Sequence, residues 1–286
     1  MPELPDLQYI AEYLNGTVTH RIIISAEIHK PVVLRLAIEG SFQVAVAGKN
    51  IESVKIHGPF LTLHIADAFD LVVNLMVAGK IQHQRPGERP QGYCCLSLSL
   101  DDESILNVCD PELMAKVYLV PCGEYGVIPK YQTQGIAITE SEFTPDRFQQ
   151  LAQVHSRKQV RVFINDHTII SSIGNAYADE ILFEAGIHPK TFVARLSTED
   201  RSRLYEAIRS VMEWGKAEVK KAGKPIHEKI RDHMRVRNRR GESCPRCGTK
   251  IRREGVRGHD VFFCPHCQPT SRKLFVDWSK VGRQKE

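Results

Sequence analysis

Met1-Pro2-Glu3-Leu4-Pro5-Asp6 stands directly before an amphipathic run that predicts a helix. Removal of Met1, which is usual before a small residue such as proline, leaves Pro2 with a free secondary amine. A terminal amine titrates near pH ~8, so part of it is neutral at physiological pH and can attack an aldehyde carbon. Glu3 stands beside it and can move protons. The stretch is therefore either a reactive terminus or a pair of prolines that only set a helix start.

The residues after this terminus predict a helix and then a β-rich region. Residues 5–15 place apolar side chains at helical spacing, and Gly16 is a suitable helix stop. Short and often alternating apolar runs follow, separated by Gly, Asp, Asn or Pro: 21–24, 42–46, 61–65, 71–75 and 96–100. Such runs are typical of antiparallel strands in a sandwich or barrel. We expect a β-sandwich that carries the terminal helix.

The second half of the chain has helical patterns. Residues 121–145 are rich in Gly and Pro and predict a linker between domains. Helical spacing returns in four ranges: 146–154, 158–164, 176–185 and 201–222. Gly186 and Gly223 follow the last two ranges, and Ser197 with Asp200 forms a candidate capping box. The expected α+β organisation is a sandwich domain 1–120, a linker 121–145, a helical domain 146–238, a ribbon 239–272 and a tail 273–286.

Charge is divided unevenly along the chain. The whole sequence has 39 Lys and Arg against 34 Asp and Glu, a net charge of +5. Residues 201–286 contain 23 basic and 10 acidic side chains, which leaves 16 and 24 for residues 1–200. The two parts therefore carry net charges of +13 and −8. A basic end of this density indicates either a nucleic-acid partner or a solvated basic surface.

The composition predicts a globular protein inside the cell. Hydrophobic residues make up 42% of the chain and charged residues 26%, which excludes disordered and fibrous classes. The sequence has no apolar run near the ~18 residues of a membrane span, and its start lacks the layout of a signal peptide. We expect a cytoplasmic or nucleoid-associated monomer with no membrane partner.

Half of the eight cysteines are paired, as Cys244-x2-Cys247 and Cys264-x2-Cys267, with 16 residues between the pairs. Two knuckles that each present two thiolates supply a closed tetrahedral site for zinc. A redox dithiol is the competing interpretation, but two pairs at this separation favour one structural zinc ion. The other cysteines are scattered among apolar residues and predict small core or surface side chains: Cys94, Cys95, Cys109 and Cys122.

The segment between the knuckles predicts a hairpin with a basic tip that suits phosphates. The basic and histidine residues that this hairpin carries are Arg252, Arg253, Arg257 and His259. A second candidate for phosphate binding is Ser172-Ile173-Gly174-Asn175-Ala176-Tyr177-Ala178-Asp179-Glu180, which opens a helix. Glycine permits close approach of the backbone, and exposed amides at a helix start attract phosphate. Taken alone, a Gly-Asn pair before a helix is more often a turn and cap than a phosphate site.

The order of these pieces resembles the formamidopyrimidine-DNA glycosylase and endonuclease VIII family. The resemblance covers nearly the whole chain and is most specific at Met1–Pro5, Asp166–Pro189 and Cys244–Gln268. In that family a terminal proline attacks the sugar carbon of a damaged nucleotide, and the adjacent glutamate assists base release and strand cleavage. A helix-two-turn-helix and a zinc hairpin clamp the DNA backbone. The resemblance implies that Pro2 is the nucleophile, that Glu3 is the acid and base, and that Gly174, Asn175, Arg257 and His259 contact DNA.

Three features of the sequence depart from the family pattern. A lysine that contacts phosphate in relatives is replaced by Pro59, which has no charge and no N–H. Lys55, His57 and Lys80 are candidates to substitute for it. His259 stands where the ribbon arginine is expected and lacks its planar fork. Relatives fill the hole left by an extruded base with methionine, arginine and phenylalanine; the counterparts here are Val77 or Met76, Glu112 and Met114.

We therefore expect a base-excision-repair glycosylase that acts on damaged or abasic DNA, with single-stranded DNA as a further substrate to test. Extrusion of the base must precede attack on its sugar. Pro59 leaves open whether β-elimination at the abasic site accompanies base excision. The alternative is a damaged-DNA-binding protein that keeps the clamp without the chemistry. A zinc-ribbon protein that binds RNA is a third interpretation.

Overall fold

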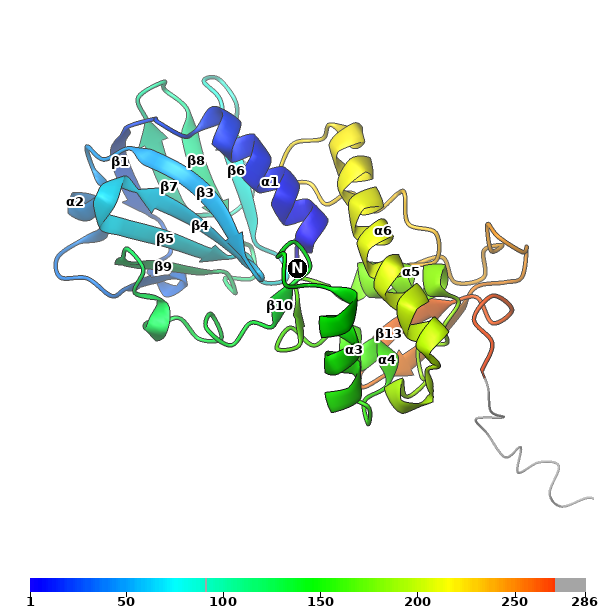
Figure 1. Ribbon diagram of the computed structural model, residues 1–286. Coiled ribbons are helices and arrows are strands. Elements are labelled where there is room, and N and C mark those ends of the chain that lie inside the picture. The colour runs from blue at the N-terminus through cyan, green and yellow to red at the C-terminus, as the bar shows by residue number, and fades with distance from the viewer. Residues whose placement is uncertain (91, 271–286) are drawn as a thin grey trace, which may run out of the picture.

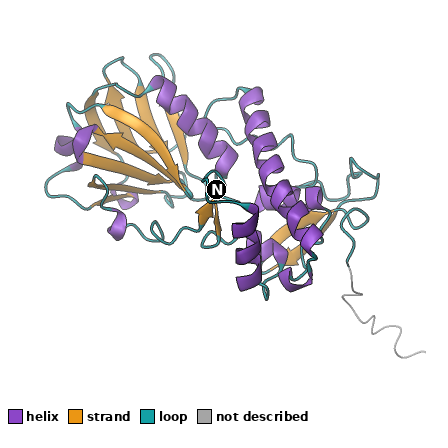
Figure 2. Cartoon of the chain, in the orientation of Figure 1, coloured by secondary structure: helices purple, strands orange, loops and turns teal. Residues whose placement is uncertain are grey.

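The computed structural model describes residues 1–90 and 92–270 and contains two bodies of different secondary structure (Figure 1). One body consists of β-sheets and the other mainly of helices, and the N-terminus lies at their junction (Figure 2). The predicted α+β architecture of β-sandwich, helical domain and four-cysteine ribbon is confirmed. The predicted tail 273–286 and the last two residues of the predicted ribbon lie outside the described residues.

The sandwich is built from two sheets that face each other. One sheet has the order β1-β7-β8-β6, with strands Ile23–Ile28, Cys94–Leu100, Ile105–Cys109 and Lys80–Gln84. The other has the order β2-β9-β5-β4-β3, with strands Leu34–Leu36, Lys116–Pro121, Phe69–Asn74, Phe60–Ile65 and Ile51–His57. Pairing is antiparallel except between β2 and β9. Short 3-10 turns, η1 (Pro31–Val33) and η2 (Ala66–Ala68), interrupt the connections.

One predicted strand of the sandwich is wrong. Residues Phe42–Val46 form the helix α2, because Ser41 Oγ accepts a hydrogen bond from Val44 N and caps a helical turn. Phe42 and Val46 are fully buried while Val44 is 79% exposed, which is the four-residue spacing of a helix face. The apolar residues at 42, 44 and 46 fit a strand equally well, so alternation alone misidentified this segment.

Helix α1 (Leu4–Thr17) connects the two bodies. Leu7, Ile10 and Leu14 pack into the core of the sandwich, whereas Leu4 packs into the core of the helical body. The helix continues past Gly16, the predicted stop, and ends where Val18 N donates to Leu14 O. Val18 is fully buried in the sandwich core, and the helix ends at Thr17, one residue beyond the glycine. The start of the chain is therefore fixed by both bodies.

The helical body contains α3 (Pro145–Val154), α4 (Val160–Ile164), α5 (Asn175–Ala185), the 3-10 turn η4 (Val193–Arg195) and α6 (Thr198–Ala222). The predicted capping box is present, since Asp200 N donates to Ser197 Oγ and Ser197 N to Asp200 Oδ2. Gly186 and Gly223 end α5 and α6 in the left-handed conformation, as predicted. Helix α5 is buried along nearly its whole length and packs on α6.

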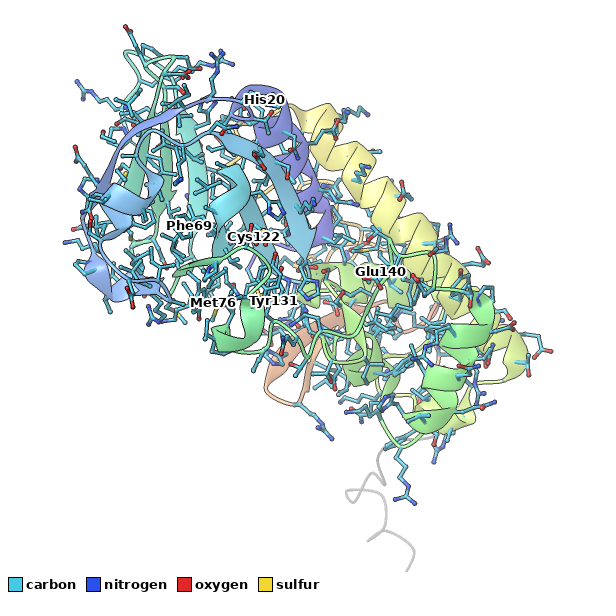
Figure 3. All side chains as sticks on the ribbon, turned by 60° about the vertical axis from the view of Figure 1, so that its left-hand side comes forward. His20, Phe69, Met76, Cys122, Tyr131 and Glu140 are labelled. Carbon is cyan, nitrogen blue, oxygen red and sulfur yellow. The ribbon has the colours of Figure 1, made fainter. Side chains whose placement is uncertain are left out.

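The segment 121–145 crosses from one body to the other. It contains the 3-10 turn η3 (Tyr125–Val127), and Tyr131 packs against Phe60 of the sandwich. Figure 3 shows Tyr131 against the sandwich and Glu140 against the helical body. Strand β10 (Ile136–Ala137) then pairs in parallel with β11 (Ile170–Ser171), just before α5. This pairing holds the crossing segment close to the start of α5.

The ribbon is a hairpin of β12 (Arg252–Val256) and β13 (His259–Phe263). Arg257 and Gly258, at its tip, both have positive φ values, as a two-residue hairpin turn requires. Phe262 and Ile251 of the ribbon pack against Phe183 of α5. The ribbon is therefore attached to the helix that begins with Gly174 and Asn175.

Candidate active site and zinc ribbon

The amino terminus lies against the start of α5. Pro2 is buried, and the Glu3 side chain is almost completely enclosed. Glu3 Oε1 accepts a hydrogen bond of 2.9 Å from Ala176 N, and Oε2 accepts one of 3.0 Å from Tyr177 N. Leu4 N also donates to Ser172 O at 3.2 Å. The first residues of the chain thus complete the N-terminus of a helix that begins more than 170 residues later.

Gly174 is required by this arrangement for a reason that the sequence did not indicate. A Cβ at position 174 would overlap the Cγ and Cδ atoms of Glu3. The amides of Ala176 and Tyr177, which we expected to be free for phosphate, are instead occupied by the Glu3 carboxylate. Gly174 therefore provides the space that brings Glu3 against α5.

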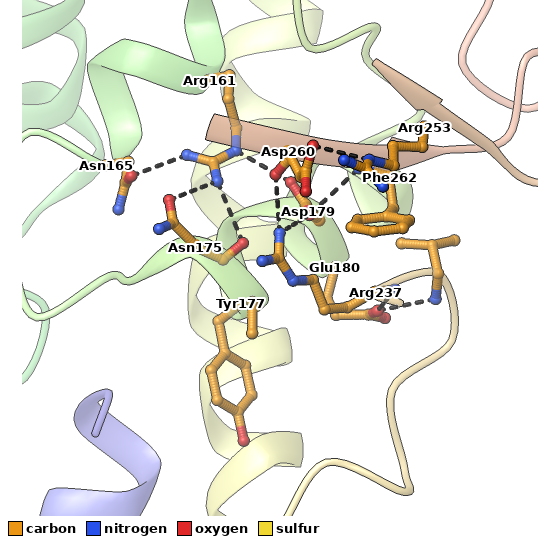
Figure 4. A network of polar contacts seen from close by, with 12 residues as sticks. Arg161, Asn165, Asn175, Tyr177, Asp179, Glu180, Arg237, Arg253, Asp260 and Phe262 are labelled. Atoms are coloured by element: carbon orange, nitrogen blue, oxygen red, sulfur yellow. Dashed lines mark hydrogen bonds and ion pairs between the residues drawn. The ribbon is translucent and has the colours of Figure 1, made fainter. Parts of the chain in front are cut away.

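Asn175 is oriented by an arginine that the sequence analysis missed. Arg161 Nη2 donates to Asn175 Oδ1 at 2.9 Å, and Arg161 Nη1 donates to Asn165 Oδ1 at 2.9 Å (Figure 4). Because Oδ1 is used in this way, Nδ2 is the side-chain atom of Asn175 that is left to donate. Arg161 is itself buried, and its Nε donates to Asp179 Oδ1 at 3.0 Å.

Two buried carboxylates of α5 connect this site to the ribbon. Asp179 Oδ2 accepts from Arg237 Nη1 at 2.8 Å and from Phe262 N at 3.3 Å (Figure 4). Burial raises the pKa of Asp179, and the guanidinium groups of Arg161 and Arg237 oppose that shift. Glu180 Oε1 accepts from three successive backbone amides, those of residues 235–237. An acidic pair within a buried helix was the signal in the sequence that arginine partners were needed.

A second cluster of charge surrounds the terminal amine. Met1 N donates to Val77 O at 3.2 Å, and Lys229 Nζ donates to the same oxygen at 2.6 Å. Arg231 binds both carboxylate oxygens of Asp6, at 2.8 and 2.6 Å. Burial lowers the pKa of the Met1 amine from 8.0 to about 6, and the Lys229 ammonium adds to the shift. Neither Lys229 nor Arg231 belongs to a sequence pattern that indicates a role beside the terminus.

The four ribbon cysteines meet at one point. Their Sγ atoms all lie within 4.8 Å of one another, with Cys244 and Cys267 at 3.9 Å and Cys247 and Cys264 at 3.5 Å. Tetrahedral zinc–thiolate bonds of ~2.3 Å separate sulfur atoms by about 3.8 Å, so the set fits zinc. Backbone amides of Arg246 and Cys267 donate to the sulfurs of Cys244 and Cys264. One structural zinc ion is confirmed as the metal that these residues hold.

The tip of the ribbon faces the Arg161 site across an open cavity of about 550 Å³. Arg257 and His259 line it from the ribbon, and Asn165, His167 and Arg161 line it from the helical body. Both tip residues are exposed. The structure therefore brings the predicted ribbon residues to the same face as the start of α5.

Three family models match separate parts of the chain. The N-terminal domain of formamidopyrimidine-DNA glycosylase matches residues 1–117, its H2TH domain matches 135–226, and the zinc finger found in this enzyme and in IleRS matches 241–270. The chain belongs to the formamidopyrimidine-DNA glycosylase and endonuclease VIII family. The three matches follow in the order that the sequence analysis expected.

Individual members of the glycosylase family are similar over most of their length. Formamidopyrimidine-DNA glycosylase from Pelotomaculum thermopropionicum is 27% identical over 278 residues, covering 94% of this chain and 99% of the relative. The enzyme from Carboxydothermus hydrogenoformans is 28% identical over 277 residues, covering 94% and 100%. A structure of the Lactococcus lactis protein with abasic-site DNA has a TM-score of 0.82 at 23% identity, covering 94% of this chain and 100% of that chain. The fold is therefore that of the glycosylases.

Pro59 occupies the position where the resemblance to the family predicts a lysine. Pro59 lies in the turn between β3 and β4, and Ser172 Oγ bonds to the neighbouring Gly58 O at 3.0 Å. His57 cannot easily replace a lysine there, because its Nε2 is bonded to Tyr131 O at 2.8 Å and its ring packs on that of Tyr131. Lys80, by contrast, lines a small pocket together with Pro2 and Lys229.

The two loops that we predicted to fill the space left by an extruded base each carry an exposed apolar side chain. Asp110 is fully buried, and its carboxylate accepts from the backbone amides of Glu112, Met114 and Ala115. Met114 is 40% exposed and Val77 58% exposed, so both can contact a ligand. Glu112 is exposed as well, with its side chain outside the hydrogen bonds of the loop.

Within residues 1–90 and 92–270, none of the helices has the length and apolar character needed to cross a membrane.

Proposed function

We propose that this chain is a base-excision-repair DNA glycosylase in which the amine of Pro2 attacks the sugar of a damaged nucleotide. The observation that supports it best is the place of Pro2 and Glu3 at the junction of the two bodies, beside the start of α5. The Lactococcus lactis relative has been crystallised with abasic-site DNA and with DNA that contains Fapy-dG. Damaged or abasic DNA is therefore the substrate class that we propose here.

The reaction begins with a neutral Pro2 nitrogen. Its lone pair forms a bond to C1′ while the C1′–N bond to the base breaks, and the base leaves with those electrons and takes a proton from water. The Glu3 carboxylate takes the proton that the Pro2 nitrogen releases and delivers it to O4′ as the C1′–O4′ bond opens, which leaves an iminium. The amides of Ala176 and Tyr177 hold the Glu3 carboxylate for this transfer.

The iminium also permits strand cleavage. A cationic iminium acidifies the C2′ proton; its loss, followed by departure of the 3′-phosphate with the C3′–O electrons, is β-elimination. In relatives a lysine contacts phosphate at the position of Pro59, so this step needs a cation from elsewhere in this chain.

DNA binding is proposed for the face that carries Asn175, Arg257 and His259. The free Nδ2 of Asn175 can donate to a phosphate oxygen. Gly174 has no side chain, so the backbone beside Asn175 takes up little space. Zinc fixes the hairpin that carries Arg257 and His259, and α5 anchors that hairpin through Phe262 N and Asp179. We propose a monomer, because a single chain supplies the amine, the carboxylate and the ribbon.

Borohydride trapping on oligonucleotides that carry an abasic site or one of several oxidised bases tests the chemistry. Borohydride reduces the iminium to a stable amine, so wild-type protein should form an adduct whose mass and peptide map assign it to Pro2. Pro5→Ala is the matched control, because it removes a proline from the same helix start but leaves the terminal amine.

A gel-shift assay run beside the trapping assay separates the two candidate functions. If wild-type protein binds damaged DNA tightly but forms no adduct, the chain is a damaged-DNA-binding protein and not a glycosylase. Pro59 and Glu112 are the residues that favour this second function. Single-stranded DNA, duplex DNA and RNA competitors in the same assay identify the preferred nucleic acid. Binding should weaken as salt rises in each case, because phosphate contacts release counterions.

A further inference from the structure

The segment between α6 and the ribbon returns to the sandwich and places a lysine beside the terminal amine. Ile226 of this segment is buried in the sandwich core, and Arg231 is held by both oxygens of Asp6. The guanidinium of Arg231 also lies 5.6 Å from the centre of the Tyr177 ring. Lys229 lies between these two attachments. Its position is therefore set by the fold although its side chain remains accessible from solvent.

The Lys229 ammonium and the terminal amine contact the same atom. Lys229 Nζ donates to Val77 O at 2.6 Å, and Met1 N donates to it at 3.2 Å. Removal of Met1 would transfer the amine to Pro2 N, three covalent bonds away. Pro2 and Lys229 line the same small pocket, so the new amine remains beside the ammonium. The reacting nitrogen of the proposed function therefore has a lysine as its neighbour.

A cation beside the terminal amine matters because of the residue at position 59. The proline there provides neither charge nor a hydrogen-bond donor. Among the candidates that the sequence offered, His57 is engaged by Tyr131, and Lys55 is an exposed residue of β3. Lys80 lines the Pro2 pocket, but Lys229 is the lysine whose nitrogen shares a hydrogen-bond acceptor with the amine.

Resting on the proposed function, we propose that Lys229 is the active-site cation of this chain and replaces the lysine that relatives carry at position 59. Before attack, its positive charge disfavours protonation of the neighbouring amine and so keeps the nucleophile reactive. During β-elimination it faces the phosphate that leaves with the C3′–O electrons and stabilises the negative charge. The other charged groups around the amine are Glu3, Asp6, Lys80 and Arg231.

Lys229→Met, Lys229→Arg and the control Lys221→Met test this assignment. Lys221 is an exposed lysine in the last turn of α6, so Lys221→Met removes the same positive charge from an exposed position outside the proposed site. Single-turnover adduct formation with abasic DNA at about pH 5, below the amine pKa of about 6, should fall about tenfold in Lys229→Met, as expected if the pKa of the amine rises by about one unit; at neutral pH the fall should be only about twofold. Lys229→Arg should retain the pH midpoint of wild type, and Lys221→Met should match wild type throughout.

A second measurement does not depend on activity. The rate at which acetic anhydride labels the terminal proline, followed by the mass of the N-terminal peptide at a series of pH values, reports the pKa of the amine directly. Its midpoint should move to higher pH in Lys229→Met alone. An unchanged midpoint together with an unchanged adduct rate would overturn the role of Lys229. Absence of any wild-type adduct, with a shifted labelling midpoint, would instead overturn the glycosylase and keep Lys229 as the neighbour of the amine.

Discussion

Asp6 and Arg231, 225 residues apart in the chain, form a two-bond ion pair that ties the first helix to the segment after α6. Asp6 is almost fully buried, and the Arg231 guanidinium also lies 5.6 Å from the centre of the Tyr177 ring. The same segment carries Lys229. The position of Pro2, the expected nucleophile, and the position of Lys229, its proposed cation, therefore both depend on the Asp6–Arg231 ion pair.

Asp6→Asn should lower the free energy of unfolding by about 2 kcal/mol, because it leaves Arg231 without its charge partner in a partly enclosed place. Urea denaturation measures this change. The double variant Asp6→Asn with Arg231→Met should cost less than the sum of the single variants. Glu12→Gln is the control: Glu12 pairs with Lys220 in an exposed position where solvent screens the charges, so its change should be much smaller. Equal losses in the two carboxylate variants would contradict the assignment.

Gly174→Ala should reduce adduct formation about a hundredfold, because the added methyl group displaces the Glu3 carboxylate from the amides of Ala176 and Tyr177. DNA affinity should change much less, since the ribbon and Asn175 remain. Gly126→Ala is the matched control, because a Cβ there has no atom within 4 Å. Single-turnover trapping and a gel shift on the same preparations measure both effects, and a parallel fall in both would indicate general disruption of α5.

Removal of zinc should unfold the ribbon and leave the sandwich intact. The ribbon core holds few apolar side chains, chiefly Phe262 and Ile251 against Phe183, so the metal supplies much of its stability. Elemental analysis should find one zinc ion per chain. Cys247→Ser should lose it and weaken DNA binding, whereas Cys122→Ser should keep it. Two zinc ions per chain, or normal DNA affinity without any, would contradict this interpretation.

Adduct formation should depend on pH through the terminal amine. Burial first, and the Lys229 ammonium second, lower the pKa of the Met1 amine from 8.0 to about 6. The Pro2 amine that replaces it lies in the same pocket. Because the neutral form attacks, the rate should rise as pH climbs through about 6 and should already be nearly constant at pH 8. A midpoint near the ordinary value of a free terminus would show that the pocket does not act on Pro2.

Local signals in the sequence were sufficient for most of the helices and for the ribbon. Ser197 with Asp200, Gly186 and Gly223 each act through neighbours within a few residues, so their meaning is visible in the sequence. The four cysteines belong to the same class, because two short knuckles define one metal site. For the segment 42–46 the spacing of the apolar residues was not sufficient, because it fits both a strand and a short helix. Only the Ser41 cap decides between them.

The surroundings of the candidate site could not be predicted, because the partners are distant in the chain. Glu3 meets Ala176, and Lys229 meets Val77, through contacts that span 173 and 152 residues. Neither the glutamate nor the lysine indicates such a distant partner by its residue type or its spacing. Arg161 was the most accessible of the missed residues, since Asp179 in an apolar helix requires a buried cation.

The division of α1 between two cores has a mechanical consequence. Leu4 is embedded in the helical body and Leu7 in the sandwich, less than one helical turn apart. Because this short piece of chain is packed into both bodies, a rotation of one body against the other would move it, and Pro2 and Glu3 with it. Closure of the two bodies on a DNA backbone would then bring the amine to its target in the same motion, because both involve the first turn of α1.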